Sequence, residues 1–193
     1  MKNLSLRGLF YSRKSNREEN EHRVAAPDFF KGPAFSPEGF IERQSALTVL
    51  RTAARTADYC GCGWIAVWNL FRTLGTVLDI PSLIEKLERG MLVSGILGTD
   101  PFFIRRFLRR SGLSVSLHLK AEKFLKSGCE NGILFYLRPD FSAHYVAFSA
   151  APEGAPRFLF HNTDAGPVTE ELPAFLDKTP HRLALFFAVK KNG

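Results

Sequence analysis

The hydrophobic pattern of the chain changes its period near Gly112, and this change limits the folds that it can adopt. Before Gly112 apolar residues recur at helical spacing, whereas after it they alternate with polar residues as strands do. Helices are predicted from Ser45 to Thr56 and in "GWIAVWNLFRTLG", "IPSLIEKLERG" and "GTDPFFIRRFLRRSG", the last of these capped by Thr99 or Asp100 and started by Pro101. Strands are predicted in "LSVSLHL", "GILFYLR", "AHYVAFSA", "APRFLFHN" and "RLALFFAVK".

Short connections separate several of the predicted strands. Turn signals such as Pro139-Asp140 and "APEGAP" favour antiparallel hairpins over helical crossovers. Short helices are expected at "AEKFLKSG" and "TEELPAFLDKT". A helical first half followed by an antiparallel second half predicts an α+β fold.

The length of the chain suits one domain. With 193 residues it can build one real core, and two domains would each be small. We expect residues 1–40 to form an N-terminal arm or extension, because prolines and glycines interrupt it. Its phenylalanines suggest that part of the arm docks on a main domain that spans residues 41–193.

Composition excludes some classes of protein. No apolar run approaches the roughly 20 residues that a membrane-spanning helix needs, and the N-terminus lacks the apolar centre of a secretory signal. The sequence therefore predicts a soluble, cytoplasmic protein without a membrane partner, and it leaves the oligomeric state open.

The formal charge of +7 is partly concentrated in one region that could attract an acidic partner. Helical spacing places its arginines away from Phe103, Phe107 and Leu108, so a solvated helix face is the simpler interpretation. No nucleic-acid motif accompanies the charge, and nucleic acid is not expected as a partner. The residues concerned are Arg105, Arg106, Arg109, Arg110, Lys120, Lys123 and Lys126.

Three cysteines, Cys60, Cys62 and Cys129, cannot all pair, and reduced thiols are expected. Cys60 and Cys62 flank a single glycine, a spacing too short for the usual zinc knuckle, so no metal site is predicted. Cys129 fits a small buried hydrophobic residue.

The two neighbouring cysteines stand where a helix is predicted to begin. Unpaired N–H groups and the helix dipole favour a thiolate there, which predicts a lowered pKa and a nucleophilic sulfur. A cysteine nucleophile needs a histidine to carry the proton. His144 starts a predicted strand, and Asn162 or Asp164 could orient its imidazole. His22, His118, His161 and His181 show no such pattern and are expected to be structural or exposed.

These motifs resemble a known family. A cysteine followed by G-x-x-A at a helix start, then a strand beginning H-Y-V, then a polar residue ending the next strand, is similar to the papain-like cysteine peptidases. More narrowly, the chain resembles their bacterial branch related to bacteriocin-leader peptidases, over roughly residues 56–190. The resemblance implies a nucleophile helix packed on an antiparallel sheet, with residues in the order Cys, His, and Asn or Asp.

The resemblance also favours one of the two thiols. Matching "CGWIAVWN" to the family pattern makes Cys62 the nucleophile, with Cys60 as the alternative. Cys60 would then pack beside the site, and Gly61 would adopt backbone angles closed to other residues.

The chain departs from the family at one position. Relatives carry a glutamine about six residues before the cysteine to stabilise the oxyanion, and Thr56 stands there in this chain, a weak substitute. Gln44 is too far upstream in sequence to assign. Losing one oxyanion donor typically costs about 100-fold or more in rate.

The resulting expectation is a cysteine-dependent hydrolase that cleaves peptide or amide bonds in a peptide or protein substrate. Cys62 attacks, His144 carries the proton, Asn162 holds the ring, and no cofactor is required. Asp164 is the alternative to Asn162. A catalytically inactive peptide-binding domain and a thiol acyltransferase or deamidase remain alternatives, because all share the same constellation.

Overall fold

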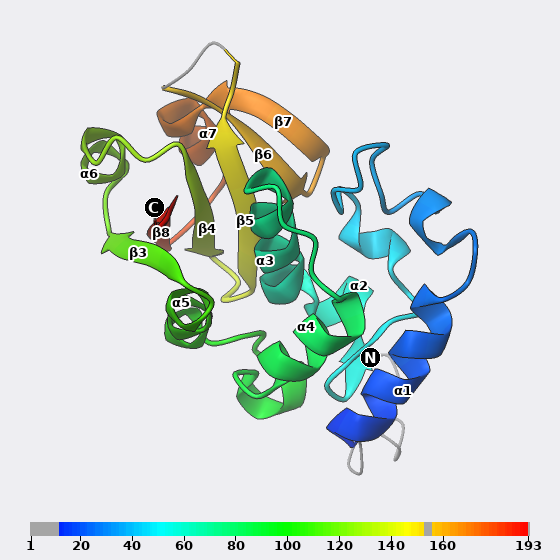
Figure 1. Cartoon of the computed structure of the whole chain (residues 1–193). Coiled ribbons are helices and arrows are strands. Elements are labelled where there is room, and N and C mark those ends of the chain that lie inside the picture. The colour runs from blue at the N-terminus through cyan, green and yellow to red at the C-terminus, as the bar shows by residue number, and fades with distance from the viewer. Residues whose placement is uncertain (1–11, 153–155, 193) are drawn as a thin grey trace.

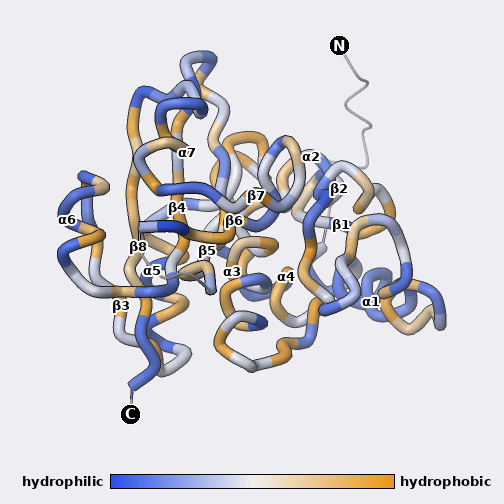
Figure 2. Tube along the Cα trace, turned by 90° about the horizontal axis from the view of Figure 1, so that it is seen from above, coloured by the Kyte–Doolittle hydropathy of each residue, from blue (hydrophilic) through white to orange (hydrophobic). Residues whose placement is uncertain are grey.

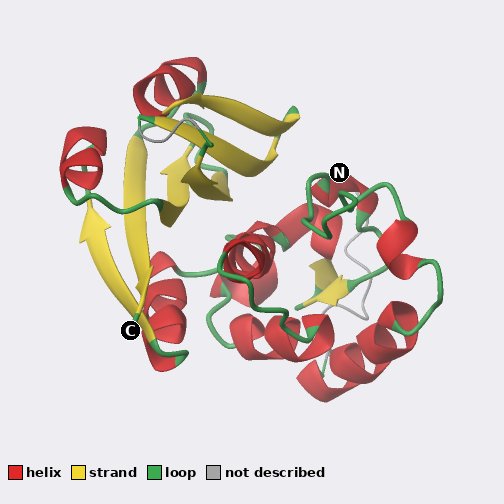
Figure 3. Cartoon of the chain, turned by 45° about the horizontal axis from the view of Figure 1, so that its top comes forward, coloured by secondary structure: helices red, strands yellow, loops and turns green. Residues whose placement is uncertain are grey.

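The computed structural model describes residues 12–152 and 156–192, and shows an α+β fold. One group of helices lies to one side of the large sheet, whereas other helices lie against the sheet itself (Figure 3). The helices are α1 (Arg13–Val24), α2 (Ala57–Cys60), α3 (Cys62–Thr73), α4 (Ile80–Glu88), α5 (Pro101–Arg110), α6 (Ala121–Lys126) and α7 (Leu172–Lys178). The strands are β1 (Arg51–Thr52), β2 (Arg55–Thr56), β3 (Leu113–His118), β4 (Asn131–Leu137), β5 (Ala143–Ala150), β6 (Arg157–Thr163), β7 (Gly166–Glu171) and β8 (Leu183–Lys191).

Within the described residues the large sheet is antiparallel and six-stranded, in the order β3-β8-β4-β5-β6-β7. This confirms the predicted α+β class and the hairpins between successive strands. The last strand, β8, inserts between β3 and β4, an order that short-range turn signals do not encode. Strand β7 replaces the beginning of the helix predicted in "TEELPAFLDKT", because the turn at Gly166, with φ +93°, folds the chain back onto β6.

Helix α3 is the centre of the molecule (Figure 1). It packs against β4, β5 and β6 on one side and against α4 on the other. Every residue from Cys62 to Phe71 is buried, and all of them except Asn69 are apolar, as is typical of a central helix. The side chain of Asn69 exchanges hydrogen bonds with the backbone of Ile41. Hydrophobic segments run along α3 and the strands in Figure 2, whereas α1 is mostly hydrophilic.

The sheet buries both of its faces. Tyr145 and Ala147 of β5 belong to the core that contains α3, whereas Val146 and Phe148 belong to a second core. Helices α6 and α7 contribute Phe124 and Phe175 to this second core. Because side chains alternate along a strand, neighbouring residues of β5 serve different cores.

The helix predicted from Ser45 to Thr56 is wrong. The chain forms a 3-10 turn (Gln44–Ala46) and then the small hairpin of β1 and β2, with Ala53 at φ +53° in its turn. Tertiary hydrogen bonds outweigh the weak helical pattern here: the Glu88 carboxylate accepts the Ala53 N–H at 2.6 Å. Asn20 of α1 donates to the Arg51 carbonyl and accepts its N–H.

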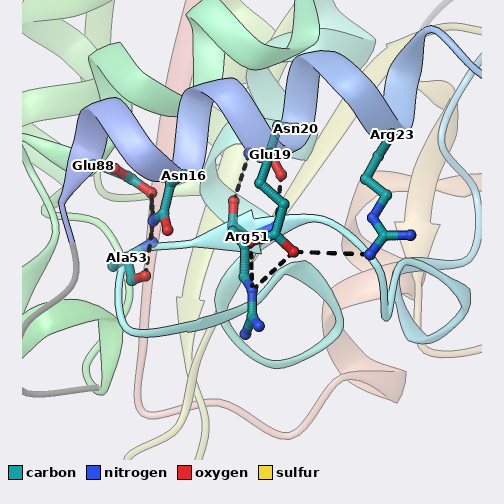
Figure 4. Close-up of polar contacts among 7 residues, drawn as sticks. All are labelled: Asn16, Glu19, Asn20, Arg23, Arg51, Ala53 and Glu88. Carbon is teal, nitrogen blue, oxygen red and sulfur yellow. Dashed lines mark hydrogen bonds and ion pairs between the residues drawn. The ribbon is translucent and has the colours of Figure 1, made fainter. Parts of the chain in front are cut away.

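Helix α1 is fastened to this hairpin by polar contacts (Figure 4). Asn16 and Asn20 are its buried residues, and Asn16 donates to the Ala53 carbonyl at 2.9 Å and to Glu88 at 2.8 Å. A short 3-10 turn (Phe29–Lys31) follows, and Phe29 and Phe35 pack on the core. The described part of the predicted arm is therefore docked, and residues 1–11 lie outside the described residues.

Helix α5 is amphipathic, as predicted. Ile104 and Leu108 are buried, whereas Phe102 and the four arginines line an open hollow of about 330 Å³ on its outer side. That an acidic partner binds this surface stays a prediction. Among the described residues, no helix combines the length and the hydrophobicity needed to cross a bilayer.

Candidate active site

Cys62 is the first residue of α3, as the sequence predicts. Gly61 precedes it as the N-cap and supplies no side-chain oxygen to the helix. The next position, 63, requires a glycine, because a Cβ there would lie 2.6 Å from the Thr99 hydroxyl oxygen. The start of α3 is thus pressed against the segment that leads into α5, and this contact fixes where the sulfur lies.

The Cys62 sulfur lies beside the beginning of β5. Strand β5 pairs with β6 only from Ala147 onward, which leaves the edge of residues 143–146 unpaired on the β6 side. The sulfur is 4.0 Å from the Ala143 carbonyl oxygen, and the backbone N–H of Tyr145 interacts with it as well. The two backbone groups that contact the sulfur therefore flank His144 in the chain.

His144 is held by its two neighbouring strands. It stands opposite Tyr136 of β4, with the two ring centroids 5.5 Å apart. Its Nε2 lies 2.9 Å from the main-chain carbonyl oxygen of Asn162. A carbonyl only accepts, so Nε2 carries a proton and Nδ1 is the nitrogen left to accept one.

Asn162 contacts His144 through its backbone rather than through its side-chain amide. It adopts φ +60°, a left-handed conformation uncommon for a residue other than glycine, at the irregularity between Phe160 and Thr163. The strict alternation predicted for this strand ends there. His161 and Asn162 both reach the segment that contains Glu42 and Gln44, and neither simply follows Phe160 into the second core.

Glu42 and Gln44 hold this left-handed turn. The Gln44 N–H donates to Asn162 Oδ1 at 3.0 Å, and Asn162 Nδ2 donates to Gln44 Oε1 at 3.2 Å. Glu42 accepts the Asn162 N–H and pairs with the ring of His161, which stacks on Phe40. Because 118 residues separate Gln44 from Asn162, no local spacing in the sequence could have identified the pair.

Gln44 also touches the helix before the nucleophile. Its amide group donates to the carbonyl oxygens of Ala57 and Asp58 in α2, at 3.0 and 3.2 Å. Both of its amide protons are therefore engaged. Thr56, the position that the sequence suggested for the oxyanion, is half-buried at the start of α2 and caps the helix with no side-chain hydrogen bond.

The pKa of Cys62 is raised, whereas the sequence analysis predicted a lowered one. Burial raises the pKa of Cys62 to about 11, and the N–H groups of Tyr145, Gly63 and Cys62 itself oppose this shift without overcoming it. Burial also lowers the pKa of His144, against the opposing effect of the Asn162 carbonyl. Both shifts favour the neutral thiol and the neutral imidazole, because the exclusion of water outweighs the helix N-terminus.

Cys60 points elsewhere. Its sulfur lies 3.3 Å from the carbonyl oxygen of Thr52 in β1. Burial raises the pKa of this thiol to about 12. Gly61 has φ −81° and ψ −9°, which any residue can adopt, so the predicted need for unusual angles is wrong. A glycine is needed at position 61 because a Cβ there would lie 2.5 Å from the Ala57 carbonyl oxygen.

Cys129 is buried in the second core, as predicted.

Asp164 is exposed and forms an ion pair with Arg138. The Arg138 guanidinium also lies 5.6 Å from the centre of the Tyr136 ring, so it stands close to His144. Its charge lowers the pKa of both His144 and Cys62. Among the described residues, no group of three or more His, Cys, Asp or Glu side chains could hold a metal ion.

No protein-family model matches the chain, and no curated protein sequence matches it. Among solved structures, it is similar to the peptidase domain of Streptococcus ComA, a bi-functional ABC transporter involved in quorum sensing. That match has 14% identity and a TM-score of 0.48, and covers 66% of this chain and 90% of that domain. A double glycine motif protease from an AMS/PCAT transporter, in complex with its leader peptide, has 14% identity, a TM-score of 0.47 and coverage of 67% and 84%.

The peptidase C39 like domain of a toxin secretion ATP-binding protein from Vibrio parahaemolyticus is also similar, at 18% identity with a TM-score of 0.38. This match covers 67% of the present chain and 93% of that domain. The fold described above, a cysteine-bearing helix packed on an antiparallel sheet, is consistent with the papain-like fold that the sequence resembles.

Proposed function

We propose that this protein is a thiol-dependent hydrolase of peptide or amide bonds, with Cys62 as nucleophile and His144 as proton carrier. One observation carries the proposal: the Cys62 sulfur, at the start of a buried helix, contacts the backbone on both sides of His144. The resemblance of the sequence to papain-like peptidases supports a peptide or protein as substrate. In this proposal residues 41–193 are the peptidase domain and residues 1–40 its extension.

The neutral resting pair sets the order of events. As the sulfur attacks the scissile carbonyl carbon, its proton passes to Nδ1 of His144, and a carbon–sulfur bond forms. The imidazolium then gives this proton to the leaving amine, and the carbon–nitrogen bond breaks. Water attacks the thioester with His144 as base, which releases the acid and restores the thiol. The N–H of Cys62 is suited to the oxyanion, and Thr56 is a weaker candidate.

The carbonyl of Asn162 replaces the expected side chain as the group that orients His144. It accepts the proton on Nε2, which keeps Nδ1 free, and it stabilises the imidazolium that forms during attack. Asp164 is occupied by Arg138, so it is the weaker candidate for this role.

An electrophilic thiol probe followed by peptide mapping tests the proposal. We expect the label on Cys62, no label at that position in Cys62→Ser, and undiminished labelling in Cys60→Ser. Labelling of Cys60 or Cys129 in place of Cys62 would contradict the assignment of the nucleophile.

One observation favours a second candidate, an inactive peptide-binding domain. Cys62 is only 5% exposed and its thiol is neutral. A chain that takes no label even at alkaline pH but still binds peptides would support this second function. Acyl transfer and deamidation pass through the same thioester, so they differ from hydrolysis only in the second nucleophile or in the amide attacked.

A further inference from the structure

A pocket of about 510 Å³ opens on the face of the sheet that is turned away from α3. Tyr136 of β4 and Phe175 of α7, both members of the second core, form part of its wall. The β4–β5 turn, the β6–β7 turn and the end of α7 complete it. The pocket therefore lies at the end of the sheet where β5 begins.

This position makes the pocket a neighbour of His144. Tyr136 lines the pocket and is the cross-strand partner of His144, with 5.5 Å between the ring centroids. Asp164, two residues after the Asn162 carbonyl that holds the imidazole, lines the pocket as well. Cys62 belongs to the core on the other face of the sheet. His144 is thus flanked in the chain by the backbone groups that contact the sulfur, and paired across the sheet with a residue that lines the pocket.

The charges around the pocket are satisfied by one another. Arg138 pairs with Asp164, and Lys178 pairs with Glu170. The remaining acid, Asp140, accepts hydrogen bonds from the N–H and the hydroxyl of Ser142. A charged ligand group would have to break one of these pairs, whereas an apolar group would meet exposed carbon.

The wall between the charges is apolar. Val168 is half-buried beside Phe175 and Tyr136, and two prolines, Pro139 and Pro180, border the same space. An aliphatic or aromatic side chain can bury its surface there without leaving a polar group unpaired. The chemistry of the lining therefore selects an uncharged, bulky substituent.

We propose that this pocket receives the apolar side chain of the residue that follows the scissile bond. This inference rests on the proposed function. The leaving amine takes its proton from His144, so the peptide beyond that amine continues on the imidazole side, where the pocket opens. The substrate class is then a peptide with an aliphatic or aromatic residue on the leaving-group side.

The inference can be tested without the natural substrate by comparing amines that accept an acyl group from Cys62. p-Nitrophenyl acetate acetylates Cys62: the carbon–sulfur bond forms and nitrophenolate leaves. An added amino-acid amide then attacks the thioester, its proton passes through His144 to the sulfur, and the acetylated amide is released. The acceptor amine occupies the position of the leaving group, so glycinamide, leucinamide, phenylalaninamide and lysinamide compared at equal concentration report the preference of the pocket.

We expect leucinamide and phenylalaninamide to capture the acetyl group at least about tenfold better than glycinamide or lysinamide, as burial of one apolar side chain implies. Val168→Trp fills the pocket and should reduce this preference to less than about twofold. Val77→Trp is the matched control, since Val77 is 69% exposed and does not line the pocket, and it should leave the preference unchanged.

The outcomes separate the two proposals. A nitrophenol burst that requires Cys62, with no preference for apolar acceptors, would overturn the pocket assignment and leave the hydrolase intact. A preference that persists in Val168→Trp would also overturn it. A chain that shows no Cys62-dependent burst would remove the proposed function and the pocket assignment together.

Discussion

At the scale of single residues, the neutral state of Cys62 makes a prediction about pH. Its pKa is raised to about 11, so the thiolate fraction and the rate of alkylation by iodoacetamide should increase as pH rises through the alkaline range. Measured from about pH 6 to 10, the rate constant of Cys62 should rise about tenfold per pH unit with no plateau, as expected below the pKa of a titrating thiol. A rate constant that is already flat from pH 6 upward would instead show a stable ion pair with His144. Cys60→Ser should give the same profile.

The left-handed turn at Asn162 gives a second residue-scale prediction. If the main-chain carbonyl orients His144, Asn162→Gly should keep Cys62 acylation within about tenfold of the natural chain, because glycine adopts this turn freely. Asn162→Val should slow the acylation of Cys62 considerably more. A branched side chain is strained by about 1–2 kcal/mol in this turn, and relief of the strain would move the carbonyl away from His144. Burst kinetics with p-nitrophenyl acetate measure both variants. Loss of acylation in both would indicate that the amide side chain is needed.

The local sequence pattern identifies some residues of the candidate site but not the others. The cysteine at a helix start and the histidine at a strand start are visible in their own segments, and the structure puts both where the pattern predicts. The orienting carbonyl is not visible, because a backbone atom leaves no residue type to recognise. Gln44 and Glu42 are equally hidden, since their partners are more than 100 residues away.

At the scale of elements, α1 and the hairpin meet around a buried acid. One oxygen of Glu88 accepts from Asn16 and Ala53, whereas the other, buried as well, has no partner among the described residues. Burial raises the pKa of this carboxyl. Because the folded chain holds the proton more tightly than the unfolded one, the contribution of Glu88 to stability is present at low pH and is lost as pH rises through its raised pKa.

Glu88→Gln tests this assignment. Glutamine keeps the accepting oxygen and places an uncharged group where the second oxygen lies, so the variant should gain stability relative to the natural chain as pH rises from about 4 to 7. Urea unfolding at several pH values measures the difference. Glu85→Gln, at a partly exposed ion pair with Arg17, should show a smaller pH dependence. A difference in stability that falls over the same pH range would contradict the raised pKa.

Most elements of the fold could be predicted because their signals are local. Asp100, one of the two caps that the sequence predicts, caps α5, and Pro101 stands in its first turn as predicted. Helix α4 is capped by Asp79, which the sequence analysis did not single out. The hairpin of β1 and β2 could not be predicted in this way. Its turn depends on Asn16 and Glu88, which come from distant parts of the chain.

At the scale of the whole molecule, a buried hydrogen bond joins the sheet to the segment that leads into α5. The buried hydroxyl of Tyr145 donates to the carbonyl of Thr99 at 2.5 Å, in the segment that also presses on Gly63. With α3 packed between the two parts, the chain should unfold in one transition. Tryptophan fluorescence, from Trp64 and Trp68 of α3, and far-ultraviolet circular dichroism should therefore give the same midpoint.

Tyr145→Phe should lower the free energy of unfolding by about 1–3 kcal/mol, because it leaves a buried carbonyl without its donor. The two signals should still coincide at the lower midpoint. Tyr59→Phe is the control, since Tyr59 is 58% exposed, and should change stability little. Separate midpoints for fluorescence and dichroism would show that the two parts unfold independently.

The central claim is that His144 carries the proton of Cys62, and the rate of Cys62 acylation in His144→Gln tests it most directly. Glutamine can still donate to the Asn162 carbonyl but cannot accept and return a proton. Measured at neutral pH as the nitrophenol burst, acylation should fall by about 100-fold or more, the usual contribution of a positioned general base. A burst of unchanged rate in a folded His144→Gln protein would contradict the account.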